Sequence, residues 1–229
     1  MKYKILLPLL VSGLFFNACS KDEATTATPE DKVLETYYPG SSLEIKEVAI
    51  YTSNGVITDP AVLNEYIDRK LSDDMKSRFY VGKSSVTMSS DNTILKFLDN
   101  NRVNINGTNM EIIGRKDSLM LIAEYTSKQV PMYGISTCSD LFAKVPEYTP
   151  LTGCADGNCA TYRKTYPIIS YGNSQYYVPI LTYAASTDQC DFASAEWPMI
   201  NVLSEDFQSK LVAGDSVLVQ YARMPLVKK

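Results

Sequence analysis

The chain has 229 residues, of which 45% are apolar, 26 are acidic and 22 are basic, so its formal net charge is −4. This acidic balance argues against nucleic acid or an anionic membrane as an electrostatic partner, because basic surfaces bind such partners. The chain contains no histidine, which excludes Ser-His and Cys-His nucleophilic catalysis and histidine-ligated zinc chemistry. The sequence therefore predicts no nucleic-acid partner, no metal site and no cofactor.

The first residues have the layout of an export signal. Two lysines precede an apolar stretch at positions 5–16, and the small residue Ala18 stands just before Cys19. At about 1.5 Å per residue this stretch spans about 18 Å, which is too short for a bilayer core of about 30 Å. Residues 1–18 are therefore predicted to be a cleaved signal peptide, and its removal leaves 20 basic and 26 acidic residues, a net charge of −6.

The residues around Cys19 carry a family resemblance. The stretch "FNAC" resembles a bacterial lipobox, and "CSKDE" resembles the acidic export tag of Bacteroidetes-type surface lipoproteins. The resemblance implies that Cys19 is lipidated and that this lipid holds the protein to the membrane. Ser20 is not the Asp that retains such proteins at the inner membrane, so the implied location is the outer membrane, exposed on the cell surface. Residues 19–35 are predicted to be the lipidated cysteine and a flexible tether.

Residues 36–229 are predicted to form a single β-rich domain. Its first strand, 43–52, alternates and then shifts phase near Val48, which indicates a bulge or a partly covered second face. A helix over 59–71 follows, with Asp59 as the N-cap and Pro60 at the first helical position. The helix carries one apolar stripe, made of Val62, Leu63, Tyr66, Ile67 and Leu71.

Short strands with turn residues between them predict an antiparallel meander. The nine predicted strands are 43–52, 85–88, 93–98, 102–106, 109–114, 118–127, 162–172, 174–186 and 215–227. The fold class is therefore mainly β, with the meander forming a barrel or a sandwich and one amphipathic helix near the N-terminus. The order of strand, "TSNG", capped helix and meander resembles uncharacterised Bacteroidetes-type lipoproteins, and this resemblance implies a lipocalin-like architecture.

The remaining cysteines favour disulfide bonds. With Cys19 lipidated, the other four cysteines are an even number, which predicts two disulfides in an oxidising compartment. Three pairings are possible. The Asp-Gly turn in "CADGNC" favours Cys154 with Cys159, which leaves Cys138 with Cys190. The C-x4-C spacing is not that of zinc ribbons or of thioredoxin-like redox motifs.

Tyrosines are the strongest indication of a binding role. The chain has 16 of them, and many lie in the hairpin formed by the strands 162–172 and 174–186. Both faces of the second strand are apolar or aromatic, so one face packs the core while the other lines a cavity, meets a partner or is covered by a loop. Tyrosine also suits strands without any binding role. The candidate ligand-binding residues are Tyr166, Tyr171, Tyr176, Tyr177 and Tyr183.

Ser118 and Ser216 follow an Asp and precede an apolar residue. These triplets resemble the O-glycosylation acceptors of Bacteroidetes, which makes both serines candidate modification sites. Each Asp-Ser pair also opens a predicted strand, where it is ordinary turn chemistry.

Two functional hypotheses follow. The first is an exported, membrane-anchored lipoprotein with a non-catalytic binding module for a small apolar ligand, a glycan or a partner protein. The second is a histidine-free glycan hydrolase that uses paired carboxylates, for which the candidate acids are Glu147, Asp188, Asp191 and Glu196. A structural envelope component is a further alternative, and no catalytic residue is assigned.

Overall fold

A computed structural model describes residues 32–88, 94–131, 137–148, 151–153, 159–172, 174–188, 190–194 and 199–228. These residues belong to one compact unit that begins at Lys32. Cys19, Cys154 and the side chains of Cys138, Cys159 and Cys190 lie outside the described residues, so the lipidation and the disulfides stay predictions. Among the described helices, none combines the length and the apolar character that crossing a bilayer requires.

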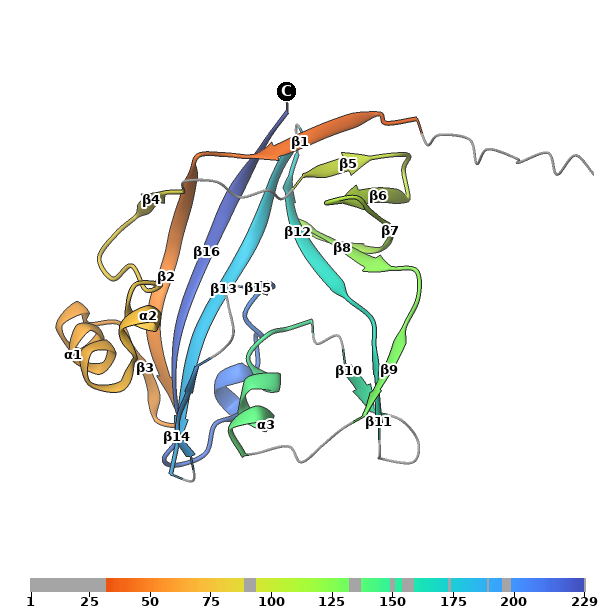
Figure 1. Cartoon of the computed structure of the whole chain (residues 1–229). Helices are drawn as coiled ribbons and strands as arrows, with labels where there is room; N and C mark the ends of the chain where they lie inside the picture. Colours follow the sequence, from red (N-terminus) through yellow and green to blue (C-terminus); the bar gives the residue numbers. More distant parts are fainter. Residues whose placement is uncertain are drawn as a thin grey trace, which may run out of the picture. The chain divides into compact units, whose positions relative to one another are not determined.

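Eight antiparallel strands close into a barrel, so the β domain is a barrel and not a sandwich (Figure 1). The predicted meander forms most of the wall, and the long strand at the C-terminus closes it by pairing with β13 along its full length. In spatial order the strands are β13 (Gln175–Thr187), β12 (Thr165–Tyr171), β8 (Leu119–Glu124), β7 (Thr108–Lys116), β6 (Arg102–Ile105), β5 (Leu95–Phe97), β1 (Glu35–Pro39) and β16 (Ser216–Lys228).

Beyond the barrel, β13 and β16 continue into an open sheet. From its C-terminal end towards its N-terminal end, one edge of β16 pairs with β1 and then with β2 (Ser42–Thr52). From its N-terminal end towards its C-terminal end, one edge of β13 pairs with β12, then with β15 (Met199–Ile200) and then with β14 (Cys190–Ser194). The short strands β3 (Gly55–Ile57) and β4 (Ser85–Thr87) pair with β2. A separate sheet contains β9 (Lys128–Pro131), β10 (Leu151–Gly153) and β11 (Cys159–Tyr162).

Three prolines lie where a strand changes or lacks a partner. Pro179 separates the part of β13 that pairs with β12 from the part that pairs with β15, and Pro167 has a partner strand on one edge only. Pro225 lies between the parts of β16 that pair with β1 and with β2, and its carbonyl accepts the N–H of Gly40 at 2.8 Å. A proline has no N–H to donate, so it fits where a ladder is interrupted. Gly40 is required there because a Cβ would lie 2.9 Å from the Pro225 ring.

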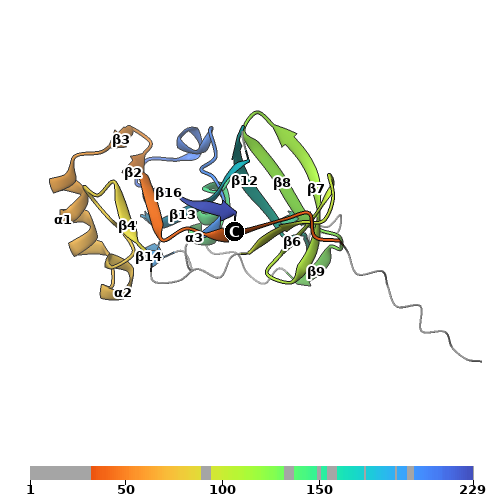
Figure 2. The same cartoon turned by 90° about the horizontal axis from the view of Figure 1, so that it is seen from above.

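Four helical segments cover the open sheet (Figure 2). The predicted helix is α1 (Pro60–Lys70), and the Asp59 carboxylate accepts the N–H groups of Ala61 and Val62 at 2.9 and 3.1 Å. Val62 is 43% exposed, so its assignment to the apolar stripe is wrong, whereas the rest of that stripe is buried. The sequence did not predict α2 (Asp73–Lys76), α3 (Thr137–Lys144) or the 3-10 helix η1 (Phe207–Lys210).

Alternate side chains of β13 and β16 face opposite sides. The even-numbered side chains fill the barrel and then pack under α1 and α2, while the odd-numbered ones lie outside the barrel and pack under α3 and η1. The barrel interior is occupied by an aromatic and aliphatic cluster in which Tyr37 lies 4.9 Å from Tyr176 and 5.8 Å from Phe97, measured between ring centroids. This packing fills the barrel interior and leaves the outer face of the barrel as the place for a ligand cavity.

Candidate functional site

A cleft of about 410 Å³ lies on the outer face of the barrel. It is bounded by β2, β12 and β16, by the turn between β7 and β8, and by the chain that follows α3 and β15. We call it the tyrosine cleft, because three tyrosine side chains line it together with four aliphatic side chains. Its lining residues are Glu47, Lys116, Asp117, Ser118, Leu119, Glu147, Tyr148, Ile169, Tyr171, Val202, Leu203, Glu205 and Tyr221.

A β-bulge turns Glu47 towards the tyrosine cleft. Tyr221 of β16 pairs with Glu47 of β2, but the next residue of β16 pairs with Ile45, so Lys46 is the extra residue. The bulge reverses the alternation, which brings both Glu44 and Glu47 to the outer face of the barrel. The phase shift in the sequence near this point indicated such a bulge, and the register confirms it. The Tyr51 hydroxyl donates to Glu47 at 3.0 Å and holds the carboxylate in place.

The far wall consists of two chain segments bonded to each other. Residues 145–148 after α3 run antiparallel to 201–204, with backbone bonds from Glu147 N to Val202 O at 2.9 Å and from Ser204 N to Val145 O at 3.0 Å. The buried Asn201 amide accepts the N–H of Tyr148 at 3.2 Å and donates to the carbonyl of the same residue at 2.8 Å. These bonds fix the backbone that carries four lining residues of the tyrosine cleft, namely Glu147, Tyr148, Val202 and Leu203.

Arg223 positions the ring of Tyr171, which lines the tyrosine cleft. Its guanidinium donates to the Tyr171 hydroxyl at 2.9 Å and lies 5.3 Å from that ring centroid and 4.3 Å from the ring centroid of Tyr177. Its other partner is Glu44, at 2.8 Å. Cation–π contacts of this kind are favourable when the cation is partly desolvated, and the Arg223 side chain is 19% exposed.

The tyrosine cleft is strongly acidic. Four carboxylates line it, against the single ammonium group of Lys116. Burial raises the pKa of Tyr148, and the negative charges of Glu147 and Glu205 raise it further. Burial also raises the pKa of Tyr221, followed by the effect of Tyr171. The phenols of Tyr148 and Tyr221 therefore stay neutral, while the carboxylates give the tyrosine cleft a negative potential.

The five predicted binding tyrosines are distributed over different environments. Tyr171 lines the tyrosine cleft, and Tyr166 lines a smaller one of about 140 Å³ that also contains Tyr148. Tyr177 lies beside Arg223 on the outer face, whereas Tyr176 packs inside the barrel. Tyr183 is buried beneath α3, where its hydroxyl donates to the carbonyl of Phe142 at 3.1 Å, and burial raises its pKa to about 12.

The two predicted glycosylation serines differ in their surroundings. Ser118 lies in the turn between β7 and β8, at the tyrosine cleft, where its carbonyl accepts the N–H of Ser170. The hydroxyl of Ser216 lies 3.2 Å from the Tyr66 hydroxyl under α1. No structural feature tests whether either serine carries a sugar.

Of the two candidate acids whose side chains are described, one lines the tyrosine cleft. Glu147 does so, together with Glu205, which the sequence did not single out. Asp188 packs against the backbone of Gly214 instead, where a Cβ would lie within 2.6 Å of its carboxylate oxygens. The side chain of Asp191 and the whole of Glu196 lie outside the described residues. Within the described part of the chain, no group of three or more acidic or sulfur ligands could hold a metal ion.

Sequence reasoning missed Tyr148, Tyr221, Glu47 and Glu205. These residues come from segments far apart in the chain and meet only because β2, β16 and the two wall segments are adjacent in the fold. One local signal was available for Glu47, since the phase shift of its strand indicated that two nearby glutamates share a face.

No protein-family model matches the chain, and neither a curated protein nor a solved structure shows significant similarity to it. The function of the protein is therefore inferred from the geometry and chemistry of the described residues.

The ion pairs of Glu44 make a pH-dependent contribution to stability. The bond from Lys46 lowers the Glu44 pKa most, followed by the bond from Arg223. A folded-state pKa below the unfolded value of about 4.3 means that the unfolded state binds more protons, so stability is lost as the pH falls through this range. We expect Glu44→Gln to be less stable than the wild type by up to about 1 kcal/mol at pH 7, and equal to it near pH 2.

Urea denaturation at both pH values measures this difference. Glu65→Gln is a suitable control, because Glu65 lies in a surface pair whose side chains are 71% and 66% exposed. A Glu44→Gln deficit that is the same at both pH values would contradict the ion-pair explanation.

Proposed function

We propose that the protein is an exported lipoprotein, anchored in the outer membrane by a lipid on Cys19 and exposed on the cell surface. The lipobox-like "FNAC", the short apolar stretch before it and the acidic tether at 19–35 support the anchor. An even number of remaining cysteines supports an oxidising location. In this proposal the domain at 36–229 does not carry out catalysis and serves as a binding module.

The tyrosine cleft is the proposed binding site, and its position outside a filled barrel is the observation that carries this proposal. Ligand sites are concave, contain an apolar surface with a few polar groups, and commonly measure about 300–1,000 Å³. The tyrosine cleft has a matching volume of about 410 Å³, and its lining combines three tyrosines and four aliphatic side chains with four carboxylates and one ammonium group. The ligand classes considered from the sequence were a small apolar molecule, a glycan and a partner protein, and each could present a group of this size.

The architecture supports a lipocalin-like interpretation of the barrel, with one difference. An eight-stranded antiparallel barrel with a helix beside it has the arrangement of that class. Lipocalins hold a ligand inside the barrel, whereas here the ring of Tyr37 is 1% exposed among the packed interior side chains. We therefore propose a lipocalin-like scaffold with its site on the outer face.

Native mass spectrometry of the full chain, purified from its own host in detergent, tests both parts of the proposal. We expect a mass increase on Cys19 that corresponds to a lipid and that Cys19→Ser abolishes. We also expect a bound ligand or partner that is lost in the double variant Tyr148→Ala/Tyr221→Ala.

Tyr125→Ala is the matched control, because Tyr125 is 50% exposed and does not line the tyrosine cleft. An unmodified Cys19 would overturn the anchor. A bound species that remains on the double variant as on the control would overturn the tyrosine cleft as its site, as would a wild-type protein that carries none.

A histidine-free hydrolase is the second candidate, and the observation that favours it is the pair Glu147 and Glu205. Both line the tyrosine cleft and both act electrostatically on Tyr148. Two carboxylates on one cleft are the minimum that glycoside hydrolysis requires. Glycan cleavage by the wild-type protein that is lost in Glu147→Gln or Glu205→Gln would favour the enzyme over the binding module.

A further inference from the structure

We infer that the tyrosine cleft binds an organic cation, namely an ammonium or guanidinium group on an aliphatic chain. This inference rests on the proposed binding function and adds the chemical class of the ligand. Three features support it. They are the negative charge of the tyrosine cleft, the tyrosine side chains that line it, and the contacts that the same surface makes with the guanidinium of Arg223.

Charge is the first feature. Glu47, Asp117, Glu147 and Glu205 contribute four negative charges to the lining, and Lys116 contributes one positive charge. An adjoining depression of about 430 Å³ shares Glu147 and Glu205 and adds Lys144, Lys210 and Asp206. Lys210 is paired with Asp206 at 2.6 Å, so it does not neutralise the glutamates. With Lys144 counted, the described residues of the combined surface still carry more negative than positive charge, which favours a cation over an anion.

The aromatic faces are the second feature. Tyr148, Tyr171 and Tyr221 line the tyrosine cleft together with the aliphatic side chains of Leu119, Ile169, Val202 and Leu203. A cation over a tyrosine ring is attracted by the electrons of that ring, and the attraction grows when the cation is desolvated. An aliphatic chain that carries the charge would also pack against the aliphatic lining residues, as the stems of lysine and arginine side chains pack on apolar protein surfaces.

Arg223 is the third feature, because it shows the same recognition within the chain. Its guanidinium lies 4.3 Å from one tyrosine ring centroid and 5.3 Å from that of Tyr171, and a carboxylate at 2.8 Å completes the contact. The lining of the tyrosine cleft shares Tyr171 with this contact and contains the same components, with Tyr148, Tyr221 and four carboxylates. Among the described lining residues, Lys116 is the one that carries a positive charge.

Saturation-transfer NMR with a matched set of probes tests the inference on the full chain in detergent. The probes are N-acetyl-lysine N-methylamide, its Nζ-acetylated form, N-acetyl-glutamate N-methylamide, butylammonium and cellobiose. We expect the lysine probe to bind at least about tenfold more tightly than its acetylated form, and the glutamate probe not to bind. Stronger binding of butylammonium would point to a small amine as the ligand, and stronger binding of the lysine probe to a basic side chain of a peptide.

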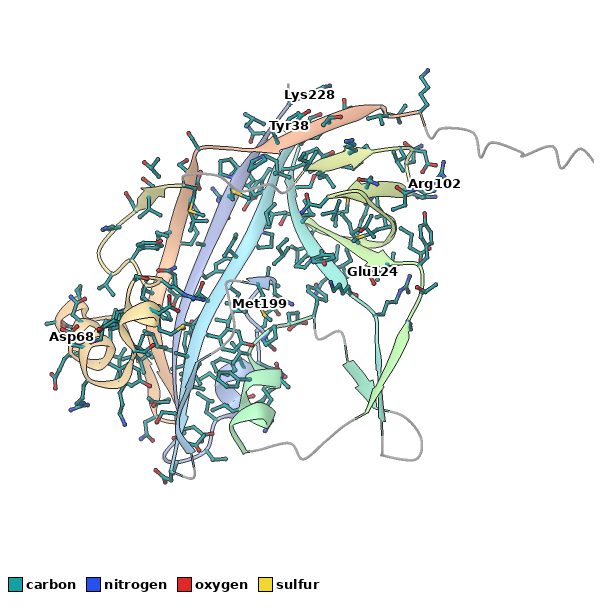
Figure 3. The ribbon with its side chains drawn as sticks, in the orientation of Figure 1. Tyr38, Asp68, Arg102, Glu124, Met199 and Lys228 are labelled. Carbon is teal, nitrogen blue, oxygen red and sulfur yellow. The ribbon has the colours of Figure 1, made fainter. Side chains whose placement is uncertain are left out.

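Two charge variants make the comparison specific. We expect Glu147→Gln/Glu205→Gln to weaken binding of the lysine probe about three- to tenfold, because two carboxylates next to the cation are neutralised. Glu65→Gln/Asp68→Asn removes the same charge from α1 and should leave affinity unchanged. Figure 3 shows Asp68 on α1, on the opposite side of β13 and β16 from Met199, which packs with the α3 and η1 cluster next to the tyrosine cleft.

The outcomes distinguish a failure of the cation inference from a failure of the proposed binding site. Equal or tighter binding of the acetylated probe or of cellobiose, lost on Tyr148→Ala/Tyr221→Ala, would overturn the cation and leave the binding site in place. Equal loss of affinity in both charge variants would mean that the net charge of the protein attracts the probe, and not the two glutamates of the tyrosine cleft. That result would also overturn the cation site. An absence of saturation transfer from every probe would overturn the cation inference, while the native mass measurement decides separately whether any ligand is bound.

Discussion

Replacement of Tyr37 by alanine is expected to lower the free energy of unfolding by about 3–5 kcal/mol. The ring is 1% exposed and stands at the end of the barrel where β1 joins β5. It makes edge contacts with Phe97 and Tyr176, at centroid distances of 5.8 and 4.9 Å. Its removal therefore forfeits the burial of an aromatic side chain, leaves a cavity, and removes two ring contacts worth about 0.5–1.5 kcal/mol each. Urea denaturation followed by circular dichroism measures the loss.

Two further variants separate the ring from its hydroxyl and from a general effect of losing tyrosine. Tyr37→Phe keeps the ring and loses the hydrogen bonds of the hydroxyl, which it makes to Glu35 at 2.7 Å and with Ser174, so it should cost about 0.5–1.5 kcal/mol. Tyr125→Ala, at a side chain that is 50% exposed, should change stability by about 0.5 kcal/mol or less. A Tyr37→Ala cost no greater than that of Tyr125→Ala would contradict the packed interior.

The same variant tests where ligands bind. A cavity lined by apolar side chains stays dry and accepts small apolar molecules. Tyr37→Ala should therefore bind benzene inside the barrel, and the wild-type protein should not, because its interior is filled. If the tyrosine cleft is the natural site, this new cavity leaves binding of the natural ligand unchanged once the variant is folded.

Local patterns predicted the longer strands of this fold, but not the barrel strand β1 or the short strands β3, β9, β10, β11, β14 and β15. Each of the nine predicted strands lies over a strand of the barrel or of the open sheet, since period-two alternation and turn residues mark strands directly. The helix at α1 was evident from Asp59 and Pro60, because the cap and the first-turn proline have a defined backbone geometry. The Asn106-Gly107 turn joins β6 to β7 with positive φ at both residues, as its sequence indicates.

Neither the closure of the barrel nor the position of the tyrosine cleft could be predicted from local sequence patterns. Pairing between β13 and β16, with Tyr176 opposite Leu226, joins strands that are far apart in the chain, and alternation does not specify the partner of a strand. Both faces of β13 are apolar, so the sequence allowed a core face and a covered face without telling them apart. The reason is that α3 and η1, which cover the odd-numbered face, were not recognised as helices.

The tyrosine cleft depends on this missing information. Tyr171 was named as a candidate on the basis of its local cluster, whereas Tyr148 and Tyr221 stand in parts of the sequence with no aromatic cluster of their own. Tyr221 is brought next to Glu47 by the bulge in β2, and Tyr148 is held by Asn201 of a segment more than fifty residues away. A site assembled from several segments has no signature within any one of them.

Gln220 is the second residue with a large expected effect. It is the only amide side chain in β16, is 2% exposed, and lies on the even-numbered face between the barrel cluster and the cluster under α1 and α2. Its carbonyl oxygen accepts the N–H of Tyr80 at 2.7 Å, and its amide donates to the carbonyl of Arg78 at 2.9 Å. The segment from Arg78 to Tyr80 follows α2, so this side chain, together with the apolar cluster under α1 and α2, attaches the helical segment to the end of the barrel.

Gln220→Leu should therefore lower the free energy of unfolding by about 2–4 kcal/mol. Leucine has a similar volume, so little cavity forms, but two backbone groups lose their partners, and an unsatisfied buried group costs about 1–3 kcal/mol. Hydrogen exchange should show the Tyr80 amide losing protection first, followed by the amides of α1 and α2, while those of β7 and β8 keep theirs. The helical segment would thus open below the energy of global unfolding.

Gln175→Leu is the matched control, because Gln175 is an exposed glutamine in the neighbouring strand β13. It should shift stability by about 0.5 kcal/mol or less and leave the protection pattern unchanged. A Gln220→Leu protein as stable as this control would show that the amide does not hold the helices to the barrel. A loss of protection spread evenly over the barrel and the helices would instead mean that the two clusters unfold as one unit, because the even-numbered face of β16 runs through both without a break.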